Sequence, residues 1–200
     1  TVQSVLHYAS PESRILIQDN SAPLNLGARL QTQFPELSIS RAPQNYGLFG
    51  GLYKSVSLAF QCINEQFDPE VVIIMDTDAL FTDYGLEDAA IAYFKRAPEV
   101  GLIGNYLAQG AGIAWAAEKL GRQLNLLGWL RDRERFRLLH ELAHRAHGNG
   151  WRDGQHVLGG VAIYNPMLIR KMGELNYLNR EPLRRTFLQV DHIFSLLCVA

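Results

Sequence analysis

The sequence predicts an α/β fold with a mostly parallel central sheet flanked by helices. Short apolar segments alternate along the chain with longer segments in which apolar residues recur at helical spacing. Strands that are separated by helices usually pair in parallel through right-handed crossovers. With 200 residues, 48% hydrophobic and 20% charged, the chain can bury a proper core as one domain over residues 1–200.

The individual elements follow from local patterns that are bounded by Pro, Gly, Asn, Asp or Ser. The predicted strands are Arg14–Ile17, Leu37–Ser40, Val71–Met75, Val100–Ile103 and Val157–Tyr164. The predicted helices are the end of a helix over Val2–Ala9, then Leu24–Phe34, Gly50–Phe67, Leu86–Phe94, a broken helical stretch over Gly112–Ala146, and two more before the C-terminus.

Charge and cysteine content argue against several classes of protein. The net charge is −1, so no nucleic-acid partner is expected, because such proteins carry a basic patch or stripe. Cys62 and Cys198 have neither metal-ligand spacing nor a disulfide framework, which favours a reducing cytoplasm. The sequence shows no uninterrupted apolar stretch of about 18 residues and no signal-peptide pattern over residues 1–10.

Two carboxylates follow the predicted strand Val71–Met75 directly. They belong to Asp76 and Asp78. In an open α/β sheet, the carboxyl ends of the strands border the crevice in which ligands bind. Mg²⁺ and Mn²⁺ take oxygen ligands, and substrate phosphates can complete their coordination shell. The sequence therefore predicts a metal site here. The alternative is a turn at the end of the strand in which both acids are solvated.

Two further features are candidates for contacting a nucleotide. Asp19 ends the first strand and is expected to face the same crevice, where it could accept an N–H from a base; an Asx turn or a helix cap is the alternative. Asn45 and Gly47 stand in a glycine-rich turn before a helix, where backbone N–H groups attract phosphate or ribose oxygens. A simple helix entry is the alternative for that turn.

The C-terminal half adds a glycine pair and a late acid. Gly159 and Gly160 interrupt an apolar strand, which indicates either a bulge or a close backbone or ligand approach. Asp191 stands at the start of the last helix, where it could act as a general base or complement the helix dipole.

Taken in this order, the motifs resemble those of family 2 glycosyltransferases of the GT-A fold. They are Asp-Asn-Ser after a strand, Asn-x-Gly-x-x-Gly-Gly before a helix, Asp-x-Asp after a strand, Gly-Gly, and a late acid. The resemblance covers residues 2–200, and Gly112–Trp151 is the least typical stretch. It implies a Rossmann-like GT-A fold and transfer of a sugar, with inversion, from a nucleotide diphosphate sugar to a hydroxyl of a glycan or lipid-linked acceptor. Synthesis of cell-surface polysaccharide or lipopolysaccharide is the process that such a transfer would serve.

The resemblance also implies roles for individual residues. Asp19 would bind the base, while Asp76 would bind the ribose or the metal. Asp78 would bind Mn²⁺ or Mg²⁺, and Asp191 would deprotonate the acceptor hydroxyl. The asparagine and the glycines singled out above would contact the nucleotide sugar.

The sequence departs from the family pattern near both of its ends. The family's first strand is expected before Thr1, and the segment that usually follows the late acid is expected after Ala200. The family's late Glu-Asp pair stands here as Val190-Asp191. The resemblance therefore implies a truncated GT-A domain.

A rival motif, His140-Glu141-x-x-His144, indicates a zinc metallopeptidase. On a helix it would place two imidazoles on one face and Glu141 as the general base. A third ligand would have to come from Glu174 or His147, and neither has the extended spacing of such enzymes. The motif is therefore ranked below sugar transfer, and a non-catalytic nucleotide-sugar-binding module is the third alternative.

Arginines at every second position from Arg131 to Arg137 lie beside Trp129 and several leucines. Basic residues beside Trp and Leu suit an anionic membrane surface, which would place a cytoplasmic protein at the inner face of the membrane. Arginines two apart, interleaved with Asp132 and Glu134, are more typical of a solvated helix face. Peripheral membrane association stays open as the less favoured interpretation.

Overall fold

The computed structural model describes residues 1–107 and 109–200 and has a mixed α/β fold. Its strands are β1 (Leu16–Asp19), β2 (Ser38–Arg41), β3 (Val72–Met75), β4 (Leu102–Leu107) and β5 (His156–Tyr164). Its helices are α1 (Val2–Tyr8), α2 (Leu26–Gln33), α3 (Gly50–Gln66), α4 (Leu86–Arg96), α5 (Ala111–Gln123), α6 (Leu126–Arg131), α7 (Arg133–Gly148), α8 (Pro166–Glu174), the 3₁₀ turn η1 (Tyr177–Asn179), α9 (Glu181–Arg184) and α10 (Val190–Val199).

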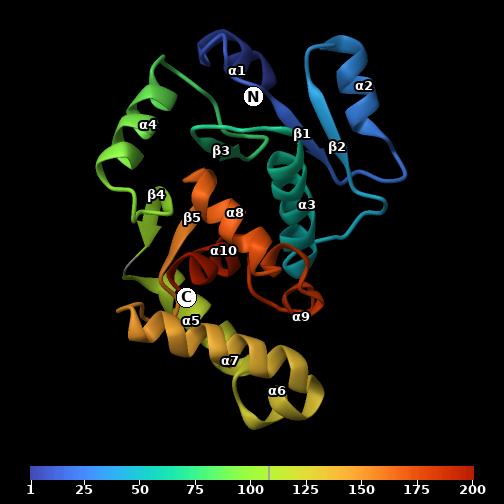
Figure 1. Ribbon diagram of the computed structural model, residues 1–200. Coiled ribbons are helices and arrows are strands. Elements are labelled where there is room, and N and C mark those ends of the chain that lie inside the picture. The colour runs from blue at the N-terminus through green and yellow to red at the C-terminus, as the bar shows by residue number, and fades with distance from the viewer. Residues whose placement is uncertain (108) are drawn as a thin grey trace.

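The strands form two separate sheets. β1 and β2 pair in parallel, with Leu16 opposite Ser38 and Asp19 opposite Arg41. The second sheet has the order β3-β5-β4, and β5 runs antiparallel to both of its neighbours. In Figure 1, α3 lies between the β1–β2 pair and the second sheet.

The prediction of a mostly parallel central sheet was wrong. Among the described residues, the only directly bonded parallel pair is β1–β2, and β5 enters between β3 and β4 in the opposite direction. A short crossover through one helix favours parallel pairing. The connection from β4 to β5 is instead a layer of three helices, which brings the chain back to the end of the sheet where β4 stops, so that His156 pairs with Leu107 and β5 runs antiparallel.

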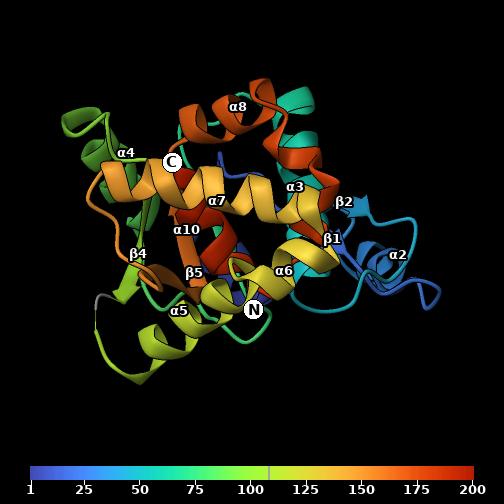
Figure 2. The same ribbon diagram turned by 90° about the horizontal axis from the view of Figure 1, so that it is seen from below.

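That helical layer closes one end of the molecule. Figure 1 shows α5, α6 and α7 at the bottom, and Figure 2 shows the same helices nearest the viewer. The predicted breaks in this stretch are confirmed, because the Asn125 side chain caps α6 and the Asp132 side chain caps α7. Within the described residues, every helix is too short or too polar to cross a bilayer.

An aromatic cluster in the larger core holds α10 against α3 and β5. The ring of Phe60 lies edge-on to Tyr164, with centroids 5.0 Å apart, and edge-on to Phe194 at 5.2 Å. Tyr53 lies 5.7 Å from Phe194, and all four side chains are buried. Such pairs contribute about 0.5–1.5 kcal/mol each beyond the burial of their area. The cluster thus fixes the start of α10 relative to β5.

The start of α3 depends on two glycines because other backbone segments touch it. A Cβ atom on Gly50 would lie 2.0 Å from the carbonyl oxygen of Arg184, and one on Gly51 would lie 1.9 Å from that of Tyr46. Neither distance is compatible with a side chain. This glycine pair therefore serves close packing between the helix and its neighbours.

We predict that Gly51→Ala lowers the free energy of unfolding by about 1–3 kcal/mol, because the added methyl group overlaps the Tyr46 backbone. Gly121→Ala is the matched control, since a Cβ there has open space in the last turn of α5. It should raise stability by roughly 0.5–1 kcal/mol, because alanine favours helix over glycine. Urea unfolding followed by circular dichroism measures both values, and equal effects of the two substitutions would contradict the packing argument.

Candidate functional site

The carboxyl end of β3 holds Asp76 in a double contact with β5. The Asp76 N–H donates to the Gly160 carbonyl at 2.8 Å, as a strand residue would. Its own carbonyl instead accepts the N–H of Ala79 at 3.1 Å, which turns the chain away from the sheet. The side-chain carboxylate of Asp76 accepts the Gly160 N–H in place of that carbonyl, through its Oδ2 atom at 3.0 Å. Asp76 and Asp78 are both exposed in this turn.

Asp191 approaches the same glycine pair from the first turn of α10. Its Oδ2 atom accepts the N–H of Gly159 at 3.1 Å. A Cβ atom on Gly159 would lie 3.6 Å from Oδ2 of Asp191 and also 3.6 Å from Oδ2 of Asp76. The two carboxylate oxygens therefore lie no farther apart than twice that distance. The structure brings together Asp76, Gly159, Gly160 and Asp191, four of the predicted site residues.

An irregularity in β5 makes this arrangement possible. On β4, Gly104 pairs with Ala162 of β5, and Tyr106 pairs with Val157. Two steps along β4 therefore correspond to five steps along β5. In this stretch α10 supplies hydrogen-bond partners through its side chains. The Val157 N–H donates to Oγ of Ser195 at 2.9 Å, two residues before the contact of Gly159 with Asp191.

The spacing of these two contacts fits the geometry of both elements. Four residues along a helix rise about 6 Å, and two residues along a strand rise about 6.6 Å. Asp191 and Ser195 therefore meet alternate residues of β5 from one face of α10. The register irregularity fits the interpretation of Gly159 and Gly160 as a bulge, and the carboxylates of Asp76 and Asp191 approach the strand at this point.

Among the described residues, no group of three or more His, Cys, Asp or Glu side chains is placed to hold a metal ion. Two carboxylates are nevertheless what Mg²⁺ commonly takes from a protein when phosphates and water supply its remaining ligands. No described residue donates a hydrogen bond to Oδ1 of Asp76 or to the Asp78 carboxylate. These exposed carboxylate oxygens are of the type that Mg²⁺ and Mn²⁺ take as ligands.

Asp19 makes its hydrogen bonds to residues other than this glycine pair. It is buried at the end of β1, where Oδ1 accepts the Ser21 N–H at 2.8 Å and Oδ2 accepts the Gly27 N–H at 2.9 Å. Burial alone would raise the pKa of Asp19, but these bonds and the charge of Arg41, 3.9 Å away, lower it below its usual value. The geometry is the Asx turn that sequence analysis gave as the alternative, extended to the first turn of α2.

Asn45 and Gly47 lie in a loop that is tied to the same end of β1. The Asn20 side chain accepts the N–H of Tyr46 at 3.0 Å, and the Asn45 side chain accepts the N–H of Gly47 at 2.8 Å. Gly47 has a φ of 73°, and Phe49, just before α3, has a φ of 53°. The loop is thus an Asx turn that leads into α3, and within the described part of the chain no hydrogen bond joins it to Asp76 or Asp191.

The His-Glu-x-x-His motif lies on the solvent-exposed side of α7. His140 and His144 are both exposed, and Glu141 pairs with Arg145 at 2.6 Å. The suggested third ligands are engaged elsewhere, since His147 contacts Asp153 at 2.8 Å and Glu174 lies 3.8 Å from Lys171. Within residues 1–107 and 109–200, nothing completes a zinc site around this pair.

Two buried histidines next to Asp191 were not singled out from the sequence. The rings of His156 and His192 meet edge-on with centroids 3.8 Å apart, and both side chains are buried. His156 donates from Nδ1 to the Gly154 carbonyl at 2.7 Å. Neither ring nitrogen of His192 has a partner among the described residues. A histidine inside the apolar helix Val190–Val199 was the signal available in the sequence.

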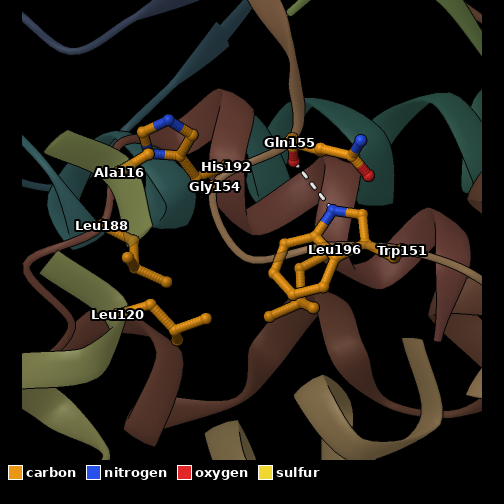
Figure 3. Close-up of a pocket in the computed structure, with 8 residues that line it drawn as sticks. All are labelled: Ala116, Leu120, Trp151, Gly154, Gln155, Leu188, His192 and Leu196. Atoms are coloured by element: carbon orange, nitrogen blue, oxygen red, sulfur yellow. Dashed lines mark hydrogen bonds between the residues drawn. The ribbon is translucent and has the colours of Figure 1, made fainter. Parts of the chain in front are cut away.

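His192 borders a narrow cavity of about 10 Å³, room for roughly one water molecule. Figure 3 shows it with Leu120, Leu188 and Leu196, and with Trp151, whose indole N–H donates to the Gln155 carbonyl. Burial, and then the neighbouring His156, lower the pKa of His192 to about 4, while the charge of Asp191 opposes this shift. The histidine at the start of α10 is therefore neutral at pH 7.

No family model, curated protein or solved structure matches this chain.

We predict that the free energy of unfolding falls between pH 6.5 and pH 4 because of His192. The unfolded chain takes up the proton near the ordinary pKa of 6.5, whereas the folded protein does so only near 4. Stability from this group is thus fully present above pH 6.5, and on the order of 3 kcal/mol is lost by pH 4. Urea unfolding across this range should show a smaller loss for His192→Leu, and the exposed control His140→Leu should behave like the wild type. Parallel curves for all three proteins would contradict the assignment.

Proposed function

We propose that this chain binds a nucleotide diphosphate sugar through a divalent cation at the end of β3 and transfers the sugar to an acceptor hydroxyl. The observation that carries the proposal is the convergence of Asp76 and Asp191 on the two adjacent N–H groups of Gly159 and Gly160. The motif order that resembles family 2 glycosyltransferases supports the same assignment.

The N–H groups of Gly159 and Gly160 orient the carboxylates of Asp191 and Asp76, which have different roles in this proposal. Each one binds a single oxygen, Oδ2, and so fixes the orientation of the carboxylate. Oδ1 of Asp76, together with the exposed Asp78, is then available to bind Mn²⁺ or Mg²⁺. The cation would supply Lewis-acid stabilisation of the leaving diphosphate.

Oδ1 of Asp191 is available to accept a proton. A general base must reach the hydroxyl that loses the proton, and a carboxylate held at one oxygen presents the other in a defined direction. The hydroxyl oxygen forms the new bond to the anomeric carbon as the bond to the diphosphate breaks, and its proton goes to Asp191. A glycan or lipid-linked acceptor and inversion of configuration follow from the family resemblance.

The first test concerns the metal-binding carboxylate. We predict that Asp78→Ala weakens Mn²⁺-dependent binding of a nucleoside diphosphate by about tenfold or more, because a charged ligand is lost from the cation. Titration calorimetry with the diphosphates UDP, GDP and dTDP and with the monophosphate CMP, with and without Mn²⁺, identifies the nucleotide and measures the change. Asp83→Ala is the matched control, because Asp83 is an exposed acid that follows the same turn. Equal affinity of Asp78→Ala and wild type would overturn the metal assignment.

The second test separates chemistry from binding. Asp191→Asn keeps an oxygen for the Gly159 N–H but cannot take a proton. We expect a fall in turnover of about 10²–10⁴-fold with near-unchanged nucleotide affinity. Turnover is measured as nucleoside diphosphate release from a panel of nucleotide sugars with glycan and lipid acceptors. Full turnover in Asp191→Asn would place the base elsewhere, and nucleotide binding without turnover in the wild type would favour a non-catalytic binding module.

A further inference from the structure

Helix α6 turns its leucines outward. The exposed fractions are 70% for Leu126, 60% for Leu127 and 58% for Leu130. The orientation is fixed by Gly128, which is buried against the preceding chain, and a Cβ there would lie 2.2 Å from the carbonyl oxygen of Gln123. The helix therefore cannot rotate to bury these leucines without losing that close contact.

Three exposed arginines follow these leucines along α6 and α7, and Arg185 neutralises the two acids that lie among them. Arg185 binds Asp132 at 2.8 Å and Glu134 at 2.9 Å. Arg131, Arg133 and Arg137 are exposed and make no ion pair with a described residue. The alternating acids and arginines of this segment therefore differ in the structure, because the acids are paired with Arg185 and the three arginines are not paired with any described residue. We call the six residues together the α6–α7 face: Leu126, Leu127, Leu130, Arg131, Arg133 and Arg137.

The two helices of this face are held together. Asp132 ends α6 and caps α7, where its side chain accepts the Arg135 N–H at 3.0 Å. The guanidinium of Arg133 lies 4.5 Å from the centroid of the Trp129 ring, which is half-buried on α6. The exposed leucines and arginines therefore belong to two consecutive helices that are held together, and Figure 2 shows these helices at the end of the molecule nearest the viewer.

We propose that the α6–α7 face binds the surface of a membrane that contains anionic lipids. Leucines that insert at the boundary of headgroups and acyl chains, flanked by arginines that meet lipid phosphates, are the two components of interfacial binding. The arginines make the surface complementary to negative charge. This inference does not depend on sugar transfer, because it rests on a surface and not on the carboxylates at β3.

A second copy of the chain fits this face poorly. The three leucines together expose less surface than two fully exposed leucines. A stable interface buries roughly 800 Å² on each partner, over about 20–30 residues a side. Two copies meeting through this face would also bring their unpaired arginines together, which opposes association.

The test measures co-sedimentation of the protein with vesicles. One set contains phosphatidylcholine alone, and the other contains phosphatidylcholine mixed with phosphatidylglycerol. We expect binding to the anionic vesicles that weakens as salt is added, and much weaker binding to the neutral vesicles. Absence of binding to the anionic vesicles, or equal binding to both sets, would overturn the proposal.

Two triple variants assign the binding to the face, and thermal unfolding checks that each one folds. In the first, Arg131, Arg133 and Arg137 are changed to Gln, which should weaken binding to anionic vesicles by about a hundredfold. In the second, Leu126, Leu127 and Leu130 are changed to Ser, which should weaken binding at high salt as well, because the inserted area is lost.

Matched controls change exposed residues of the same types on other elements. They are Arg14, Arg29 and Arg96 changed to Gln, and Leu24, Leu48 and Leu80 changed to Ser. Control variants that bind like the wild type support the α6–α7 face. Controls that lose binding as much as the test variants would show only a general charge or hydrophobic effect and would overturn it. Concentration-dependent dimerisation that the leucine triple variant abolishes, without vesicle binding, would assign the face to a second copy.

Discussion

The arrangement of the candidate site depends on how β5 satisfies its backbone N–H groups where its pairing with β4 is irregular. Ser195 accepts the buried N–H of Val157, which needs a partner because water does not reach it, and Asp191 and Asp76 accept the more exposed N–H groups of Gly159 and Gly160. The same bonds that complete the sheet therefore orient two carboxylates. The aromatic contacts of Phe194 in α10 hold that helix in register with the strand.

The chain uses carboxylates at strand ends in two different ways. Asp19 is buried and gives both of its oxygens to backbone N–H groups and to Arg41, so it stabilises the turn into α2. Asp76 is exposed and gives one oxygen to Gly160. A fully bonded, buried carboxylate has little capacity left for a ligand, whereas a half-bonded, exposed one can bind a cation. This difference directs the functional proposal to β3 and not to β1.

Much of the site could be predicted because strand ends, glycine interruptions and helix starts leave clear local patterns. Asp76, Gly159, Gly160 and Asp191 were all recognised in that way. The antiparallel direction of β5 could not be read from the sequence, because alternation of strands and helices looks the same for a long helical connection as for a simple crossover. The outward leucines of α6 depend on the contact of Gly128 with Gln123, and the burial of His192 depends on His156. Such contacts join distant or differently oriented segments, which local patterns do not encode.

The most direct measurement of the central claim is paramagnetic line broadening by Mn²⁺ in protein labelled with isotopic glycine. With a nucleoside diphosphate present, a cation at the end of β3 should broaden the amide signals of Gly159 and Gly160 selectively, because the Gly160 N–H binds the proposed metal ligand Asp76 and Gly159 is the next residue along the strand. The signals of Gly121 in α5 and Gly148 at the end of α7 serve as internal references. Broadening of Gly148 with unchanged Gly159 and Gly160 signals would place the cation near the α7 histidines and would contradict the account.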